Sequence, residues 1–216
     1  MTASTASIDA RPNYLALGDS YTIGEGVAED QRWPARLTSG LGARGLVLGD
    51  PQIIAMTGWT TDELAAGMER ADLQSSYSLV SLSIGVNNQY RQRDLDNFRQ
   101  EFGLLLQRAI ELAGADKQRV IVLSIPDWSV TPFGRSTGRD LSQESAELAA
   151  YNQAKREITE ANGVLYFDIT PSTLAAANDA SLLAADGLHP SGKLYALWVE
   201  QIIDGVQALL QTRTDC

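Results

Sequence analysis

The sequence predicts a three-layer α/β/α sandwich built on a five-stranded parallel sheet. Five short apolar runs of β-prone residues alternate along the chain with five longer segments of helical periodicity. Parallel strands need crossover connections, and right-handed helical crossovers cover both faces of the sheet. A chain of 216 residues can bury the core of one such domain without a metal or a disulfide.

Each predicted strand is bounded by Gly, Pro, Asp or Ser. The strands are expected at 14–17, 52–56, 79–84, 120–125 and 164–169, and the helices at 31–43, 61–71, 93–113, 142–162 and 192–211. Thr60 to Glu63 resembles a capping box that opens the second helix, and Gly114 and Gly163 stand where the third and fourth helices should stop. We expect one domain over residues 14–216, preceded by a mobile leader of residues 1–13.

Composition excludes several classes of protein. Seventeen Lys and Arg against 27 Asp and Glu give a net charge of −10, which disfavours nucleic acid and anionic membrane as partners. No stretch has signal-peptide character or ~20 uninterrupted apolar residues, so we expect a cytoplasmic protein without integral membrane association. The single cysteine, Cys216, has no partner within the chain, so it can form a disulfide only between molecules. The sequence predicts no metal site and no cofactor, and it makes no prediction of the oligomeric state.

The residues able to carry chemistry follow the predicted strands. Ser20 follows the first strand, Gly58 the second and Asn87 the third, and a loop at 127–139 follows the fourth. Asp186 and His189 come after the fifth strand. Because the carboxyl ends of parallel strands meet at one edge of the sheet, we expect these residues to share one crevice.

His189 is the only histidine, so it is the one candidate for a general base. A serine nucleophile needs an imidazole to take its proton, and the imidazole needs a carboxylate to fix its tautomer. Ser20 is the candidate for the nucleophile, and Asp186 is the candidate for the carboxylate. The plainer alternatives are that Ser20 only caps a helix and that Asp186 to His189 is a surface Asx turn. Thr22 stands where the G-x-S-x-G elbow needs its second glycine, which disfavours the α/β-hydrolase fold.

Asn87 and Gly58 are candidates for an oxyanion hole. The Asn87 amide can donate a hydrogen bond without adding charge, and Gly58 has no Cβ to keep a substrate oxygen away from its backbone N–H. Alternatively, Asn87 only tolerates a turn conformation and Gly58 is only a hinge before the helix.

Four blocks in this order resemble the SGNH hydrolases, also called the GDSL esterase and lipase family. They are Gly18-Asp19-Ser20-Tyr21, the lone Gly58, Gly85-Val86-Asn87-Asn88 and Asp186-Gly187-Leu188-His189-Pro190. The resemblance covers nearly the whole chain and implies a flavodoxin-like α/β/α fold. It also implies Ser20 as nucleophile, His189 as general base and acid, and Asp186 as the group that orients the imidazole. The oxyanion hole would then consist of the Ser20 N–H, the Gly58 N–H and the Asn87 side chain.

The chain departs from the family pattern at two positions. Tyr21 replaces the usual leucine, which should alter packing and not chemistry. Asn88 replaces the usual aspartate, so a neutral amide must make any hydrogen bonds that the carboxylate makes in relatives.

Loops at the same edge should decide specificity. Trp59, Trp128 and Phe133 are candidates for the walls of an acyl pocket, Arg91 for contact with an acidic group, and Asn88 for substrate contact. The alternatives are that the aromatic rings fill the core and that Arg91 is solvated.

The sequence therefore predicts a serine esterase that acts on small or short-chain acyl esters, with a small-molecule ester as its partner. Within enzymes, the alternative is a thioesterase or lysophospholipase, or a carbohydrate deacetylase, that uses the same site. Outside enzymes, the alternative is a flavodoxin-like binding module, but no complete receiver or P-loop pattern is present.

Overall fold

Five parallel strands form the central sheet, in the spatial order β2-β1-β3-β4-β5. The computed structural model describes residues 12–211. The strands are β1 (Tyr14–Gly18), β2 (Gln52–Ala55), β3 (Leu79–Ser83), β4 (Val120–Leu123) and β5 (Leu165–Phe167). The central strands β1, β3 and β4 are fully buried, as expected for a parallel sheet covered on both faces. The predicted α/β fold with a five-stranded parallel sheet is confirmed.

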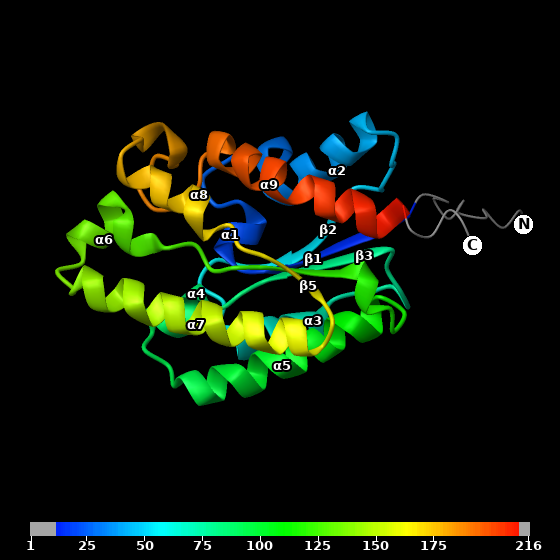
Figure 1. Cartoon of the computed structure of the whole chain (residues 1–216), viewed down its shortest axis with the longest axis horizontal. Helices are drawn as coiled ribbons and strands as arrows, with labels where there is room; N and C mark the ends of the chain where they lie inside the picture. The colour runs from blue at the N-terminus through cyan, green and yellow to red at the C-terminus, as the bar shows by residue number, and fades with distance from the viewer. Residues whose placement is uncertain (1–11, 212–216) are drawn as a thin grey trace, which may run out of the picture.

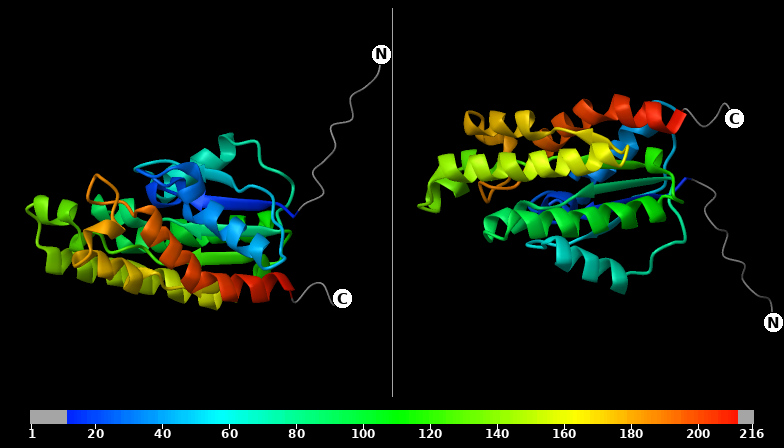
Figure 2. Two further views of the ribbon diagram at one scale, coloured as in Figure 1. Left: turned by 90° about the horizontal axis from the view of Figure 1, so that it is seen from above. Right: turned by 60° about the horizontal axis from the view of Figure 1, so that its bottom comes forward.

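Helices cover the two faces of the sheet (Figures 1 and 2). One face carries α2 (Trp33–Ala43), α8 (Thr170–Leu174) and α9 (Gly192–Gln211). The other carries α3 (Thr61–Arg70), α5 (Leu95–Leu112) and α7 (Leu141–Ala161). The capping box at the start of α3 is confirmed, since the Thr60 N–H donates to the Glu63 carboxylate at 2.9 Å. Gly114 and Gly163 adopt left-handed conformations just beyond α5 and α7, where helix stops were predicted.

The remaining helical segments are short, and most were not predicted. They are α1 (Ser20–Ile23), α4 (Val86–Tyr90), α6 (Pro132–Ser136) and the 3₁₀ turns η1 (Glu29–Gln31), η2 (Lys117–Arg119), η3 (Trp128–Val130), η4 (Ala175–Ala177) and η5 (Ala180–Leu182). One turn is too short to show an apolar period in the sequence. For this reason the segment 127–139, predicted as a loop, contains both η3 and α6.

The last two residues of the predicted leader, Pro12 and Asn13, lie within the described residues. Pro12 and Asn13 belong to the fold: the Asn13 amide donates to Ser76 O at 2.9 Å, and its oxygen accepts from the Ser78 N–H at 2.9 Å. These bonds fix the start of β1 against the loop before β3. The rest of the predicted leader, residues 1–11, and Cys216 lie outside the described residues.

A buried lysine ties the ends of two strands together beneath the carboxyl edge of the sheet. The Lys155 ammonium, on α7, donates to Ile84 O at 2.9 Å and to Leu123 O at 2.8 Å, and its side chain is fully buried. Burial lowers the pKa of Lys155, whereas the charge of Asp19, which is also buried, opposes that change. The carboxyl ends of β3 and β4 are therefore held at a fixed separation.

We expect the substitution Lys155→Met to lower the free energy of unfolding by about 3–5 kcal/mol. The reason is that two buried carbonyls lose their hydrogen-bond donor and the buried Asp19 carboxyl loses its neighbouring positive charge. Urea unfolding followed by circular dichroism measures this change. The matched control is Lys193→Met, which removes an exposed ion pair with Asp179 and should change stability by less than about 1 kcal/mol. Equal effects of the two substitutions would contradict this role of Lys155.

Candidate active site

The carboxyl ends of β1, β2 and β3 lie level with one another. Gly18 is in register with Ala55 on one side and with Ser83 on the other. The turns that follow these strands therefore start from the same edge and bring Ser20, Gly58 and Asn87 together. The strand order reverses between β1 and β3, and in open parallel sheets ligands bind at such a switch point.

Ser20 begins α1 directly after the first strand. A Cβ at Gly18 would lie 2.4 Å from Ser83 O, so only glycine lets the two strand ends approach this closely. Asp19 caps α1, with its carboxylate accepting from the Tyr21 N–H at 3.0 Å. The cap that sequence analysis considered for Ser20 is thus made by its neighbour, and the Ser20 hydroxyl stays available. Within residues 12–211, no acceptor is found for the Ser20 N–H, as expected for the first turn of a helix.

Asp186 and His189 form a hydrogen-bonded pair in the turn before α9. His189 Nδ1 and Asp186 Oδ2 are 2.6 Å apart, and Asp186 Oδ1 accepts from the N–H groups of Leu188 and His189 at 2.9 and 3.0 Å. Partial burial raises the pKa of Asp186, but these hydrogen bonds outweigh it and hold the pKa below its ordinary value. An ionised carboxylate only accepts, so it places the proton of a neutral imidazole on Nδ1 and leaves Nε2 as the acceptor.

The turn that carries this pair is fixed at both ends. The Ala184 N–H donates to His189 O at 2.8 Å, and Leu183 and Pro190 form an isolated antiparallel bridge. The Tyr21 ring packs against the imidazole with 5.3 Å between ring centroids. His189 is only 7% exposed. The backbone bonds of the turn and the Tyr21 ring together hold its imidazole in place.

The backbone around Gly58 is held by two side chains of the segment after β3. Gly58 has a φ of 86°, and its carbonyl accepts from Arg91 Nη2 at 2.6 Å. The Asn87 amide donates one N–H to Trp59 O at 2.9 Å, which leaves its second N–H for another acceptor. The Gly58 turn and the Asn87 side chain are thus fixed relative to each other.

A cavity of about 140 Å³ opens where these elements meet. Polar and apolar residues share its lining. The lining residues are Ser20, Tyr21, Thr57, Gly58, Val86, Asn87, Tyr90, Trp128, Phe133, Leu188 and His189. Asp186 lies behind His189 and does not line the cavity. The structure thus brings together the candidates for nucleophile, base and oxyanion donors, with Trp128 and Phe133 as walls.

Three side chains that sequence analysis placed in the substrate pocket do not line the cavity. Asn88 is fully buried; its oxygen accepts from the Thr61 N–H at 3.1 Å and its amide donates to Thr61 Oγ1 at 2.6 Å. Trp59 lies against Gly67 of α3, where a Cβ would be 2.2 Å from the indole. The Arg91 guanidinium is engaged by Gly58 O and by Glu63. Each of these side chains bonds to or packs against the loop around Gly58 or the start of α3, and substrate contact at these positions stays a prediction.

Several residues that line the cavity were not predicted from the sequence. Tyr21 was expected to affect packing alone, yet its ring contacts His189 and lines the cavity. Its position next to Ser20 was the signal that pointed to it. Val86 and Leu188 gave no such signal, because each is an ordinary apolar residue within one of the blocks, and Tyr90 lies two residues beyond the third block.

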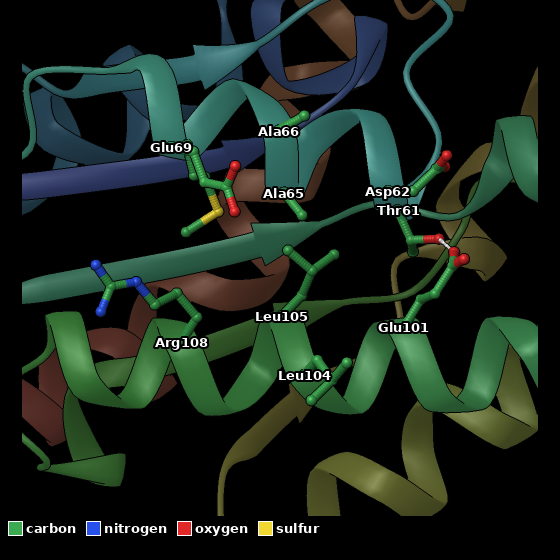
Figure 3. Close-up of a pocket in the computed structure, with 10 residues that line it drawn as sticks. Thr61, Asp62, Ala65, Ala66, Glu69, Glu101, Leu104, Leu105 and Arg108 are labelled. Atoms are coloured by element: carbon green, nitrogen blue, oxygen red, sulfur yellow. Dashed lines mark hydrogen bonds between the residues drawn. The ribbon is translucent and has the colours of Figure 1, made fainter.

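A larger hollow of about 420 Å³ lies between α3 and α5 (Figure 3). It is lined by Ala65, Ala66, Leu104 and Leu105, with Glu69, Glu101 and Arg108 around them. The chain's single histidine does not line it. The candidates for nucleophile and base, Ser20 and His189, line the smaller cavity instead.

Among residues 12–211, no group of three His, Cys, Asp or Glu side chains is arranged to hold a metal ion. No helix in this part of the chain is both long enough and apolar enough to cross a membrane.

Comparison with known proteins identifies the class to which the chain belongs. Residues 16–197 match the GDSL-like lipase/acylhydrolase family. The chain belongs to this family, also called the SGNH hydrolases, and is a hydrolase that acts on ester bonds. The resemblance expected from the four blocks is confirmed, and the alternative of a non-enzymatic binding module is set aside.

Solved structures share the fold at low sequence identity. A lipase/acylhydrolase from Enterococcus faecalis is 19% identical, with a TM-score of 0.70 over 91% of this chain and 96% of that one. The psychrotrophic esterase EstA from Pseudoalteromonas sp. is 16% identical, with a TM-score of 0.67 over 92% and 98%. Axe2, an acetylxylan esterase from Geobacillus stearothermophilus, is 18% identical, with a TM-score of 0.67 over 90% and 94%. A search of curated protein sequences found no match.

Proposed function

We propose that the protein hydrolyses small carboxylic esters through a Ser20-His189-Asp186 triad and an acyl-enzyme intermediate. The observation that carries this proposal is that Ser20 and His189 line one cavity while Asp186 holds Nδ1 of the same imidazole at 2.6 Å. A nucleophile beside a base that is itself oriented by a third group is the arrangement that activates a serine.

The mechanism has two half-reactions. Ser20 Oγ attacks the ester carbonyl carbon while His189 Nε2 takes its proton, and the resulting oxyanion accepts from the Ser20 N–H, the Gly58 N–H and the free N–H of Asn87. The C–O bond then breaks, and His189 returns the proton to the leaving alcohol. Water attacks the acyl-enzyme by the same steps, with His189 first as base and then as acid, and releases the carboxylic acid.

The size of the cavity supports a short acyl group. Sites for drug-sized ligands typically enclose about 300–1,000 Å³. The cavity beside Ser20 has a volume of about 140 Å³, and Tyr90, Trp128 and Phe133 are among its lining residues. A short apolar acyl chain fits this space, and a long one needs the walls to move.

A sugar acetate is the second candidate substrate. The likeness to Axe2, described as an acetylxylan esterase, and the small cavity both favour an acetyl group. Thioesters and lysophospholipids use the same chemistry at the carbonyl, but their long acyl chains suit this cavity less well.

The test combines turnover with covalent labelling. The wild-type protein should hydrolyse p-nitrophenyl acetate and butyrate faster than octanoate, and a fluorophosphonate probe should add its mass to the peptide that contains Ser20. Acetylated xylose and an acetyl thioester of matched acyl length then separate the substrate classes. No turnover of any acetyl or butyryl ester, or labelling at another serine, would overturn the proposal.

Removing the Asn87 amide should lower kcat for p-nitrophenyl acetate by roughly 10²–10³, the effect typical of losing one oxyanion donor. The variant is Asn87→Ala, and steady-state kinetics give the change. The control is Asn97→Ala, which removes an exposed amide of α5 bonded to Glu101 and should leave kcat unchanged. A loss of less than tenfold in Asn87→Ala would show that this amide does not stabilise the oxyanion.

A further inference from the structure

Three aromatic rings form one side of the cavity beside Ser20. Tyr90 and Trp128 meet edge to face with 5.2 Å between centroids, and Phe133 lies 6.0 Å from Tyr90 and 6.3 Å from Trp128. All three line the cavity, and we call them the aromatic wall. They come from α4, η3 and α6, which are all short segments and not parts of a long helix.

A buried amide fixes the indole of this wall. Trp128 Nε1 donates to Gln89 Oε1 at 2.9 Å, and Gln89 Nε2 donates to Glu144 Oε2 at 2.6 Å. Trp128, Gln89 and Glu144 are all at most 5% exposed. Because a buried polar group that loses its partner is costly, this chain of bonds permits only one orientation of the indole.

Arg139 connects Glu144, the last member of this series of hydrogen bonds, to the aromatic wall. It stands in the connection between α6 and α7, and its Nη1 donates to Glu144 Oε1 at 3.3 Å and to Tyr90 O at 3.0 Å. Its guanidinium lies 4.3 Å from the centroid of the Tyr90 ring and 5.8 Å from that of Trp128. A planar guanidinium can bond in its plane and stack on its face at once, which an ammonium group does not do.

These contacts converge on the wall. Arg139 contacts two of its three rings, Gln89 bonds the indole, and Glu144 of α7 binds both Arg139 and Gln89. By contrast, another arginine bonded to α7, Arg99, pairs with Glu157 on the exposed surface and touches no lining residue of the cavity. The contacts of Arg139 are therefore suited to control the shape of the cavity.

We propose that Arg139 is a positioning residue that, through Glu144 and Gln89, holds the aromatic wall rigid and thereby restricts the site to short acyl chains. This proposal rests on the esterase function proposed above and adds a determinant of its acyl specificity. Protein interiors are close-packed, so a wall whose polar edges are fixed does not yield to extra methylenes. Released from Arg139, the Tyr90 and Trp128 rings gain room to shift, and longer chains gain space.

The test measures kcat/KM for p-nitrophenyl acetate, butyrate and octanoate in Arg139→Met, Arg139→Lys and the control Arg99→Met. Arg139→Met should raise the octanoate-to-acetate ratio about tenfold, the low end of what one methylene is worth in an apolar pocket. Arg139→Lys retains the positive charge but not the stacking, so its ratio should fall between those of Arg139→Met and the wild type. Arg99→Met should keep the wild-type ratio.

A second readout reports on the wall without any turnover. In protein labelled with 5-fluorotryptophan, the fluorine resonance of Trp128, assigned with Trp128→Phe, should shift or broaden in Arg139→Met and not in Arg99→Met. A resonance that coincides with the wild type, an unchanged ratio, or an equal loss for all three esters would overturn the role of Arg139 while leaving the esterase proposal intact. A wild-type protein inactive on every ester would overturn both.

Discussion

Replacing Ser20 with alanine should lower kcat for p-nitrophenyl acetate by roughly 10⁶, leaving only what the oxyanion donors and substrate binding contribute. The reason is that no other group in the cavity replaces the covalent step. Thr57 also lines the cavity, but its hydroxyl donates to the Glu25 carboxylate. Apart from Ser20, no serine is among the lining residues that His189 could activate. Steady-state kinetics with matched circular dichroism spectra measure the change.

The control for this experiment is Ser172→Ala. The Ser172 hydroxyl donates to Ile169 O at 2.8 Å within α8, outside the cavity, and its loss should leave kcat as it is. If Ser20→Ala retains more than about one per cent of the wild-type rate, the acyl-enzyme mechanism fails, because the triad acts as a unit and a partial role for its nucleophile is not expected.

The second large effect concerns the tautomer of His189. Asp186→Asn preserves the shape of the turn, but its amide can donate to Nδ1 and so leave the proton on Nε2, where the base must accept one. We expect kcat to fall by roughly 10⁴, the scale of the same change in a well-studied serine protease triad. The comparison uses p-nitrophenyl acetate at a pH where the wild type is fully active.

Asp179→Asn provides the matched control. Asp179 is an exposed carboxylate in the same segment of the chain, paired with Lys193 at 2.8 Å, and its neutralisation should change kcat little. A loss of less than about tenfold in Asp186→Asn would mean that the 2.6 Å contact to His189 serves the turn and not the reaction.

Much of the fold could be predicted from the sequence because its signals are local. Buried strands read as short apolar runs, and α9 was predicted with the bounds Gly192–Gln211 that the structure has. Predicted strands tended to run one or two residues too far, as at 52–56 against Gln52–Ala55, because apolar character continues where the chain has already left the sheet. Short helices such as α4 and α6 were missed because one turn has no period to detect.

The candidate residues for the chemistry were also readable from the sequence. A chain with one histidine has one candidate base, and Asp186 lies three residues before it in a turn. Whether Ser20 or Asp19 caps α1 was not readable, since both residue types serve as caps and the choice depends on backbone geometry at the end of β1. In the structure Asp19 is the cap, which leaves the Ser20 hydroxyl available for the proposed role.

The sequence by itself determined the family, the order of the strands and helices along the chain, and the residues that the mechanism proposes to use. Only the tertiary structure decided what surrounds them: Asn88 and Arg91 hold the backbone near Gly58, and Arg139 stacks on Tyr90, 49 residues away along the chain. Such contacts leave no periodic or local signal, because any arginine, amide or aromatic residue can occupy many environments. Packing between distant segments selects one of these environments, and that selection fixes the shape of the cavity.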